Sequence, residues 1–274
     1  MPASYANKLA ALLALVALCA SCAVNLSEAR PARVLRGGEI QLAQINNIVV
    51  PTSAIADSAS SAKSLYSSLK TQQTPSGADA RSYASRATAI ALAGPGYATH
   101  IDLGIGLGYQ FDTSLRFGNG IYAASLRRGV DFGPWAASLG VRAGYNSGQS
   151  VISYLDDANG YIDLADTTRF DGQLFAQLGR DFGEWGRLWF GAKGMYSAYA
   201  LRVGAPQLGV ATEEVRDHLL LLGGNIGIAL GFRHVFAVGE LTILHAAGTL
   251  RAFGQSRDLG GVTIAPSWGI MGQF

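Results

Sequence analysis

Few residues in this chain could take part in catalysis, and they are scattered along it. The four histidines are His100, His218, His234 and His245. None has the spacing of a metal site such as His-Glu-x-x-His, and no cysteine after residue 22 could complete one. Asp156-Asp157 and Asp217-His218 each place a carboxylate beside a second titratable group, the arrangement that general acid–base catalysis uses. The alternative for both pairs is a set of solvated loop residues.

The stretch Tyr97 to Phe111 shows what kind of element must position such residues. It reads YATHIDLGIGLGYQF, with apolar or aromatic side chains at nearly every odd position and small, polar or charged ones at the even positions. Successive side chains of a β-strand point to opposite faces. One apolar face with tyrosine near each end is typical of a strand that meets lipid outside and a polar lumen inside. A half-buried strand of a soluble sandwich also alternates.

The composition favours the membrane alternative. Of 274 residues, 49% are apolar and only 15% are charged, and the mean hydropathy is +0.21. After the first twenty residues no stretch has the ~18 uninterrupted apolar residues of a membrane helix. Backbone crosses a bilayer only as helices or closed barrels. The net charge of +2 and the lack of basic runs interleaved with aromatics give no sign of nucleic-acid binding.

The same alternation recurs, and it predicts an all-β, antiparallel, up-and-down transmembrane β-barrel of ten strands. An eight-strand barrel is the alternative; it merges Thr113–Val130 into one strand and leaves everything before Tyr97 in the periplasm. Apolar positions switch from odd to even across Gly118–Gly120, which favours a hairpin there. The predicted strands are Glu39–Val50, Tyr97–Phe111, Thr113–Phe117, Ile121–Val130, Trp135–Asn146, Phe170–Arg180, Leu188–Ala198, Leu220–Phe232, Phe236–His245 and Gly261–Phe274.

Connection lengths predict the orientation. Short turns follow the second, fourth, sixth and eighth strands, and short turns of such barrels lie in the periplasm, which places both chain termini there. The predicted outer loops are Ser147–Thr168, Leu201–Arg216 and Gly248–Gly260. Residues 52–94 are rich in alanine and serine and predict a helical insert with helices at Ala54–Lys70 and Ala78–Ala93. The insert either plugs or caps the barrel, or forms a surface appendage.

The inward-facing positions carry an unusual number of charges. Because buried charges need partners, we expect an ion-pair network across the lumen. A barrel this narrow is mostly filled by side chains, although the inward glycines leave room for a thin water path. The members of this candidate network are His100, Asp102, Arg116, Arg127, Arg142, Asp171, Lys193, Arg233 and Glu240.

The first residues have the pattern of an export signal. Lys8 precedes the apolar run Leu9–Ala20, which is too short for a confident membrane anchor. The run ends at Ala20-Ser21-Cys22, which resembles a bacterial lipoprotein signal and implies lipidation of Cys22 and an outer-membrane destination. The alternative is an ordinary cleaved signal with an incidental cysteine. The predicted domains are a signal peptide at 1–21, a polar tether at 22–38 and a barrel at 39–274.

The last predicted strand carries a second resemblance. Trp268, Ile270 and Phe274 lie on one face, and the sequence ends on Phe274. The terminal strand with a final aromatic resembles that of bacterial outer-membrane β-barrel proteins of the small, eight- to ten-stranded type, over roughly Glu39 to Phe274. The resemblance implies that the barrel-assembly machinery reads this strand. It also implies outer-membrane lipid and lipopolysaccharide as partners.

The chain lacks the sequence motifs of enzymes that are built on such barrels. Outer-membrane phospholipases and lipid A deacylases have a histidine and a serine two residues apart, whereas His245-Ala246-Ala247 lacks the serine. The spacing of Asp156-Asp157 and Asp217-His218 departs from the omptin protease motifs. We therefore expect no enzyme and no cofactor, but a structural or interaction role that presents extracellular loops. The alternatives are a narrow pore for small solutes and, behind it, an outer-rim hydrolase or protease.

Overall fold

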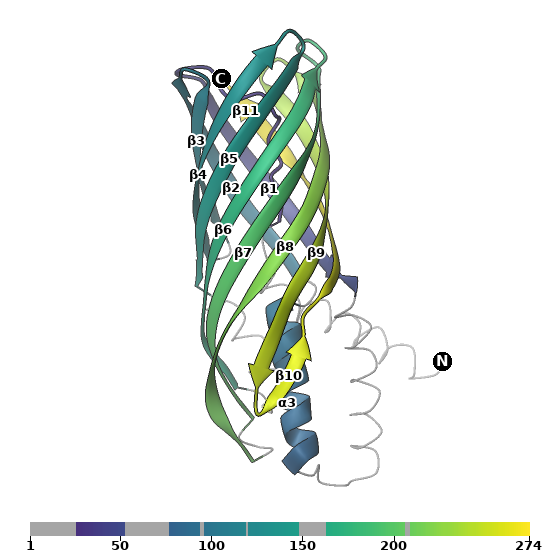
Figure 1. Ribbon diagram of the computed structural model, residues 1–274. Helices are drawn as coiled ribbons and strands as arrows, with labels where there is room; N and C mark the ends of the chain where they lie inside the picture. Colours follow the sequence, from purple (N-terminus) through teal and green to yellow (C-terminus); the bar gives the residue numbers. More distant parts are fainter. Residues whose placement is uncertain (1–25, 53–76, 94–95, 119, 148–162, 206–208) are drawn as a thin grey trace, which may run out of the picture.

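The chain folds into a closed β-barrel, with a helix at the end where the longest strands extend (Figure 1). The computed structural model describes residues 26–52, 77–93, 96–118, 120–147, 163–205 and 209–274. The strands are β1 (Ile40–Pro51), β2 (Gly96–Gly108), β3 (Phe111–Gly118), β4 (Ile121–Phe132), β5 (Trp135–Ser147), β6 (Asp163–Asp181), β7 (Gly186–Ala205), β8 (Val210–Phe232), β9 (Val235–Ala252), β10 (Gln255–Asp258) and β11 (Gly261–Gln273), and the helix is α3 (Gly77–Ala93).

Each strand up to β9 pairs with its sequence neighbour in antiparallel fashion, β11 pairs with β9, and β11 closes the ring by pairing with β1. The short β10 pairs only with the end of β9, so the barrel described here has ten strands. The ten-strand prediction is confirmed. β3 and β4 are separate strands joined at Gly118–Gly120, where Gly120 has φ +74° and a Cβ would lie 2.7 Å from the Ser147 carbonyl oxygen.

The outer surface of the barrel is an apolar band between two rings of aromatic side chains. On β4, Tyr122 and Phe132 lie at the two edges of the band, with Leu126 and Val130 facing outward between them. At ~3.3 Å per residue and a tilt of ~40°, this stretch spans roughly 25 Å, the height of a lipid-facing band. The exception on β4 is Arg128, which also faces outward and stacks on Phe111, 5.5 Å from the ring centre.

In the described part of the chain, no helix is both long enough and apolar enough to span a bilayer.

Four tight connections gather at one end of the barrel, where the carboxyl terminus also lies (Figure 1). The first turns at Tyr109–Gln110, and both residues have positive φ, 49° and 63°. β2 therefore ends at Gly108, and the predicted strand end at Phe111 is wrong. Tyr109 is part of the turn. An aromatic residue fits the lipid headgroup level equally well at a strand end or in a turn, so the tyrosine did not distinguish the two.

At the opposite end, β6 to β9 extend well beyond the apolar band. The predicted loop Leu201–Arg216 is mostly strand, since Ala200 pairs with Arg216 and Arg202 with Glu214. The predicted loop Gly248–Gly260 instead contains the β9–β10 hairpin, and β6 begins within the loop predicted at 147–168. Outside the bilayer the outward side chains need not be apolar, and here Leu201, Val203 and Val215 face inward instead, so the alternation is inverted relative to the lipid-facing band while backbone pairing continues.

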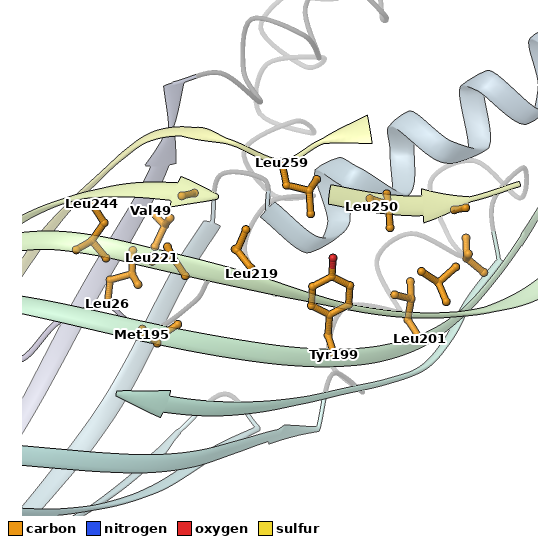
Figure 2. Packing of buried hydrophobic residues seen from close by; sticks show 14 of the residues in the cluster. Leu26, Val49, Met195, Tyr199, Leu201, Leu219, Leu221, Leu244, Leu250 and Leu259 are labelled. Atoms are coloured by element: carbon orange, nitrogen blue, oxygen red, sulfur yellow. The ribbon is translucent and has the colours of Figure 1, made fainter. Parts of the chain in front are cut away.

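The interior of this extension is apolar, and α3 packs against it (Figure 2). Ala84 of α3 is fully buried, and the Arg257 Nη2 of β10 donates to the Ser82 Oγ at 2.9 Å. The helix therefore covers the long-strand end, whereas the first predicted helix, Ala54–Lys70, lies outside the described residues. The principal members of the apolar cluster are Leu26, Val49, Ala84, Met195, Tyr199, Leu201, Val203, Leu219, Leu221, Leu244, Leu250 and Leu259.

Candidate functional site

The lumen of the barrel is filled by the chain's own amino-terminal segment. We call residues 26–38, which precede β1, the lumen segment. All residues from Leu26 to Ala32 are buried inside the barrel, followed by the buried Val34 and Leu35. At the short-turn end the segment turns back, with the Glu39 N–H donating to the Arg36 carbonyl at 2.9 Å, and continues into β1. The described part of the predicted tether at 22–38 is thus an internal element of the barrel.

The inward glycines of β2 make room for this segment. A Cβ on Gly106 would lie 1.7 Å from the Arg36 carbonyl oxygen, and one on Gly104 would lie 3.0 Å from the Arg30 Nη2. The alternating GIGLG sequence therefore combines an apolar outer face with an inner face that has no side chains. The space that these glycines leave is taken by backbone and by arginine.

Asp112 holds the half of the lumen segment nearest the short turns. Its carboxylate accepts two hydrogen bonds from Arg127, at 2.9 and 2.6 Å, and lies 3.2 Å from the Arg30 Nη2. It also accepts the Leu35 N–H at 3.0 Å. Arg127 donates in addition to the Pro31 carbonyl at 2.9 Å. One carboxylate on β3 thus joins the barrel wall to the backbone and to a cation of the segment.

Glu240 on β9 binds the backbone in the middle of the lumen segment. Its two carboxylate oxygens accept the N–H groups of Glu28 and Ala29 at 2.7 and 2.8 Å. The indole of Trp189 and the amide of Asn225 donate to the same carboxylate at 3.2 and 2.9 Å. Lys193 lies 3.6 Å away and donates to the Leu26 carbonyl. Consecutive N–H groups converging on a carboxylate form charge-assisted hydrogen bonds, which are stronger than neutral ones.

The side chain of Glu28 forms a third link between segment and wall. Both guanidinium NH2 groups of Arg142 donate to it at 2.8 Å, in the planar two-bond geometry that favours arginine. The Gln173 amide donates to the same carboxylate at 3.2 Å. Glu28 is fully buried, so its charge is balanced by the wall and not by water.

Arg116 links two strands of the barrel wall to each other and also links the wall to the lumen segment. It forms two hydrogen bonds with Asp102, at 2.7 and 2.6 Å, and donates to the Ser27 carbonyl at 2.8 Å. His100 lies beside this pair, with its Nε2 3.7 Å from the Asp102 carboxylate. Seven of the nine predicted network residues therefore lie in this interior: His100, Asp102, Arg116, Arg127, Arg142, Lys193 and Glu240.

The other two predicted members lie elsewhere. Asp171 faces the lumen on β6 but is bound by Arg169 and by the Ser197 hydroxyl, away from the lumen segment. Arg233 is not in the lumen: it forms part of the β8–β9 turn, is 66% exposed and lies 3.9 Å from Glu184. Its placement inside was wrong, because its φ of +54° turns the chain before the strand alternation reaches it.

Sequence reasoning missed three members of the network: Glu28, Arg30 and Asp112. Asp112 could have been predicted from the sequence, because it lies directly opposite Arg127 in the β3–β4 pairing. No sequence pattern identifies Glu28 and Arg30, because their partners on the wall lie 114 and 82 positions further along the chain.

The candidate catalytic and modified residues contribute little to this interior. On β8, His218 faces outward and stacks on Tyr196, with its Nδ1 3.6 Å from the Asp217 carboxylate. Asp156-Asp157 and Cys22 lie outside the described residues. Within the described ranges, no three His, Cys, Asp or Glu side chains lie close enough together to hold a metal ion. Trp268, Ile270 and Phe274 face outward at β11, and Phe274 stacks on His234.

Comparison with known proteins adds only distant likenesses. No protein-family model matches the chain, and no curated protein matches its sequence. Neisserial surface protein A is 8% identical, with 86% of this chain and 96% of that one aligned at a TM-score of 0.31. Ail of Yersinia pestis is 8% identical over 87% and 99%, also at 0.31. An anion-selective porin from Comamonas acidovorans is 17% identical over 66% and 61%, at 0.21. At these TM-scores the fold assignment depends on the strand pairing itself.

Proposed function

We propose that this chain is an outer-membrane β-barrel protein whose lumen is closed by its own amino-terminal segment and whose role is to present its outer rim to binding partners. The observation that carries the proposal is the filled lumen. Four wall residues, Asp112, Arg116, Arg142 and Glu240, bind the segment through its side chains and its backbone. A barrel closed in this way is a rigid support, and the proposal assigns it no catalytic step.

The lipid-facing band and the connection lengths support the location. A closed barrel with an apolar outer band has no edge and can satisfy its backbone within a bilayer. Short turns of outer-membrane barrels lie in the periplasm, so the extensions of β6 to β9, with β10 and α3, face outward from the cell. We call these extensions, together with β10 and α3, the outer rim.

The first test of this proposal is electrical. The full-length mature chain is expected to give no discrete currents in planar bilayers, because the segment occupies the lumen. A variant lacking residues 26–36 is expected to conduct, since the wall then presents Asp102, Arg116, Arg142 and Lys193 to water. Steady currents of one size from the full-length chain would contradict closure and would favour the narrow-pore alternative.

A second test concerns the outer rim. Deleting residues 201–215 removes the paired ends of β7 and β8 without touching the apolar band. This variant is expected to keep the heat-modifiable gel migration of a folded barrel and to lose at least tenfold in affinity for whatever partner the full-length chain binds on intact cells. A matched control replaces Gly133–Pro134 in a short turn and keeps that binding. Equal binding by both variants would contradict a role for the outer rim.

The pore alternative has one observation in its favour. The wall that surrounds the segment is polar and charged, so a barrel from which the segment had withdrawn would hold water. Such a change would break the pairs of Glu28 with Arg142 and of Arg30 with Asp112, together with the backbone hydrogen bonds to Glu240. Closure is therefore the state that the contacts favour.

A further inference from the structure

The two ends of the lumen segment lie at opposite levels of the barrel. Its carboxyl end is at the short turns: the Gly38 N–H donates to the Gly106 carbonyl at 3.0 Å, and Arg33 lies 2.5 Å from Asp131 and from Asp181, which flank two of those turns. Its amino end is deeper. The Leu26 side chain belongs to the apolar cluster of the long-strand end, together with Val49 near the far end of β1.

From this direction we infer that the chain passes through its own barrel, so that everything before Leu26 emerges at the end opposite the carboxyl terminus. The inference rests on the proposed function for its orientation: with the short turns in the periplasm, the amino-terminal end lies at the cell surface. The sequence predicted both termini in the periplasm, and the path of the lumen segment leads to a different arrangement.

Chain length makes the arrangement restrictive. Leu26 lies at the level of Lys193, because the Lys193 ammonium donates to the Leu26 carbonyl. Lys193 lies seven residues beyond the start of β7 at Gly186. With a rise of ~3.3 Å per residue and a tilt of ~40°, that level is roughly 18 Å from the short-turn end. The four Cα–Cα steps from Cys22 to Leu26 span at most about 14 Å. These residues would also have to run back through a lumen that the segment already fills.

The consequence concerns membrane attachment. If Cys22 carries the lipid that its signal resembles, the acyl chains belong in the outer leaflet at the cell surface, on the same face as the outer rim. The chain would then be held in the membrane twice, by its barrel and by a surface anchor. The β1–β11 seam must also close around the segment, because β1 follows the segment directly in sequence and pairs with β11 along most of its length.

The experiment compares epitope tags at two positions on intact cells. One tag is inserted between Asn25 and Leu26, and a second protein carries the same tag in the short turn at Gly133–Pro134. We expect antibody to bind the first tag on intact cells and the second only after the outer membrane is permeabilised. A tag placed within residues 148–162, in a predicted outer loop, is the positive control for surface exposure.

The outcomes separate this inference from the proposed function. Tags on opposite faces support threading, and the face on which the turn tag appears tests the orientation alone. Both tags on the same face, in proteins that keep heat-modifiable migration, would overturn the threading. Currents from the full-length chain would contradict closure without moving either tag. Protection of the Arg33 peptide bond from trypsin in each tagged protein verifies that the segment remains inside.

Discussion

Replacing Asp112 by alanine is expected to lower the free energy of unfolding by about 3–5 kcal/mol, the cost of breaking a buried charge pair from one side. Two fully buried guanidinium groups, Arg30 and Arg127, share this carboxylate, and the Leu35 N–H also donates to it. Without it the two cations face each other in a medium of low dielectric constant. The measurement is urea unfolding in lipid vesicles, followed by the gel migration of folded and unfolded forms.

The control for this variant is Asp171→Ala. Asp171 also faces the lumen and binds an arginine, but it is partly exposed and does not touch the lumen segment. A loss of about 1 kcal/mol or less is expected there. If both variants lose the same stability, Asp112 has no special role in holding the segment. Trypsin cleavage after Arg33 gives an independent readout, because release of the segment exposes that bond while the barrel persists.

The second large effect is expected from Glu240→Ala. The substitution leaves the N–H groups of Glu28 and Ala29 without their acceptor and the ammonium of Lys193 without its negatively charged partner inside the barrel. An unpaired buried charge and two unsatisfied donors together cost about 3–5 kcal/mol or more. We expect the segment to leave the lumen, so that the variant conducts in planar bilayers and trypsin cleaves after Arg33 at least a hundredfold faster.

The Glu240→Gln variant distinguishes the effect of the side chain's charge from the effect of its shape. Glutamine keeps one acceptor oxygen and the same volume, but its NH2 group opposes one of the two backbone donors. An intermediate loss of about 1–3 kcal/mol is therefore expected, with slower cleavage than in the alanine variant. Glu184→Gln, in an exposed turn, is the matched control and should change neither quantity. A glutamine variant as stable as the unmodified chain would show that the negative charge contributes nothing to holding the segment.

These expectations explain why the lumen carries so many charges. Four acids, Glu28, Asp102, Asp112 and Glu240, and five bases, Arg30, Arg116, Arg127, Arg142 and Lys193, are all nearly inaccessible to water. Buried ion pairs add little net stability, yet removing one partner is costly. Their effect here is to fix the position of an extended segment that has no regular secondary structure. Within the segment, Glu28, Arg30 and Arg33 each lie beside an opposite charge of the barrel wall.

The barrel itself was determined by local pattern. Apolar side chains at every second position, with aromatics at both edges, indicate a strand in contact with lipid. The change from odd to even apolar positions across Gly118–Gly120 indicated a hairpin in place of a continuous strand. Inward charges such as Asp102, Arg116 and Lys193 could be identified for the same reason. These features follow from a period of two residues, which is readable without knowledge of any partner.

The tertiary structure alone decided what fills the barrel and how far its strands extend. Beyond the lipid, β7 and β8 pair through Arg202 and Glu214, whose polar side chains face outward, the reverse of the pattern in the lipid-facing band. Within residues 26–38, the same few charges and small residues are compatible with a solvated tether or with an internal segment. Only the positions of Asp112, Arg142 and Glu240, brought together by closure of the sheet, distinguish the two, because the contacts that hold the segment join residues far apart in sequence.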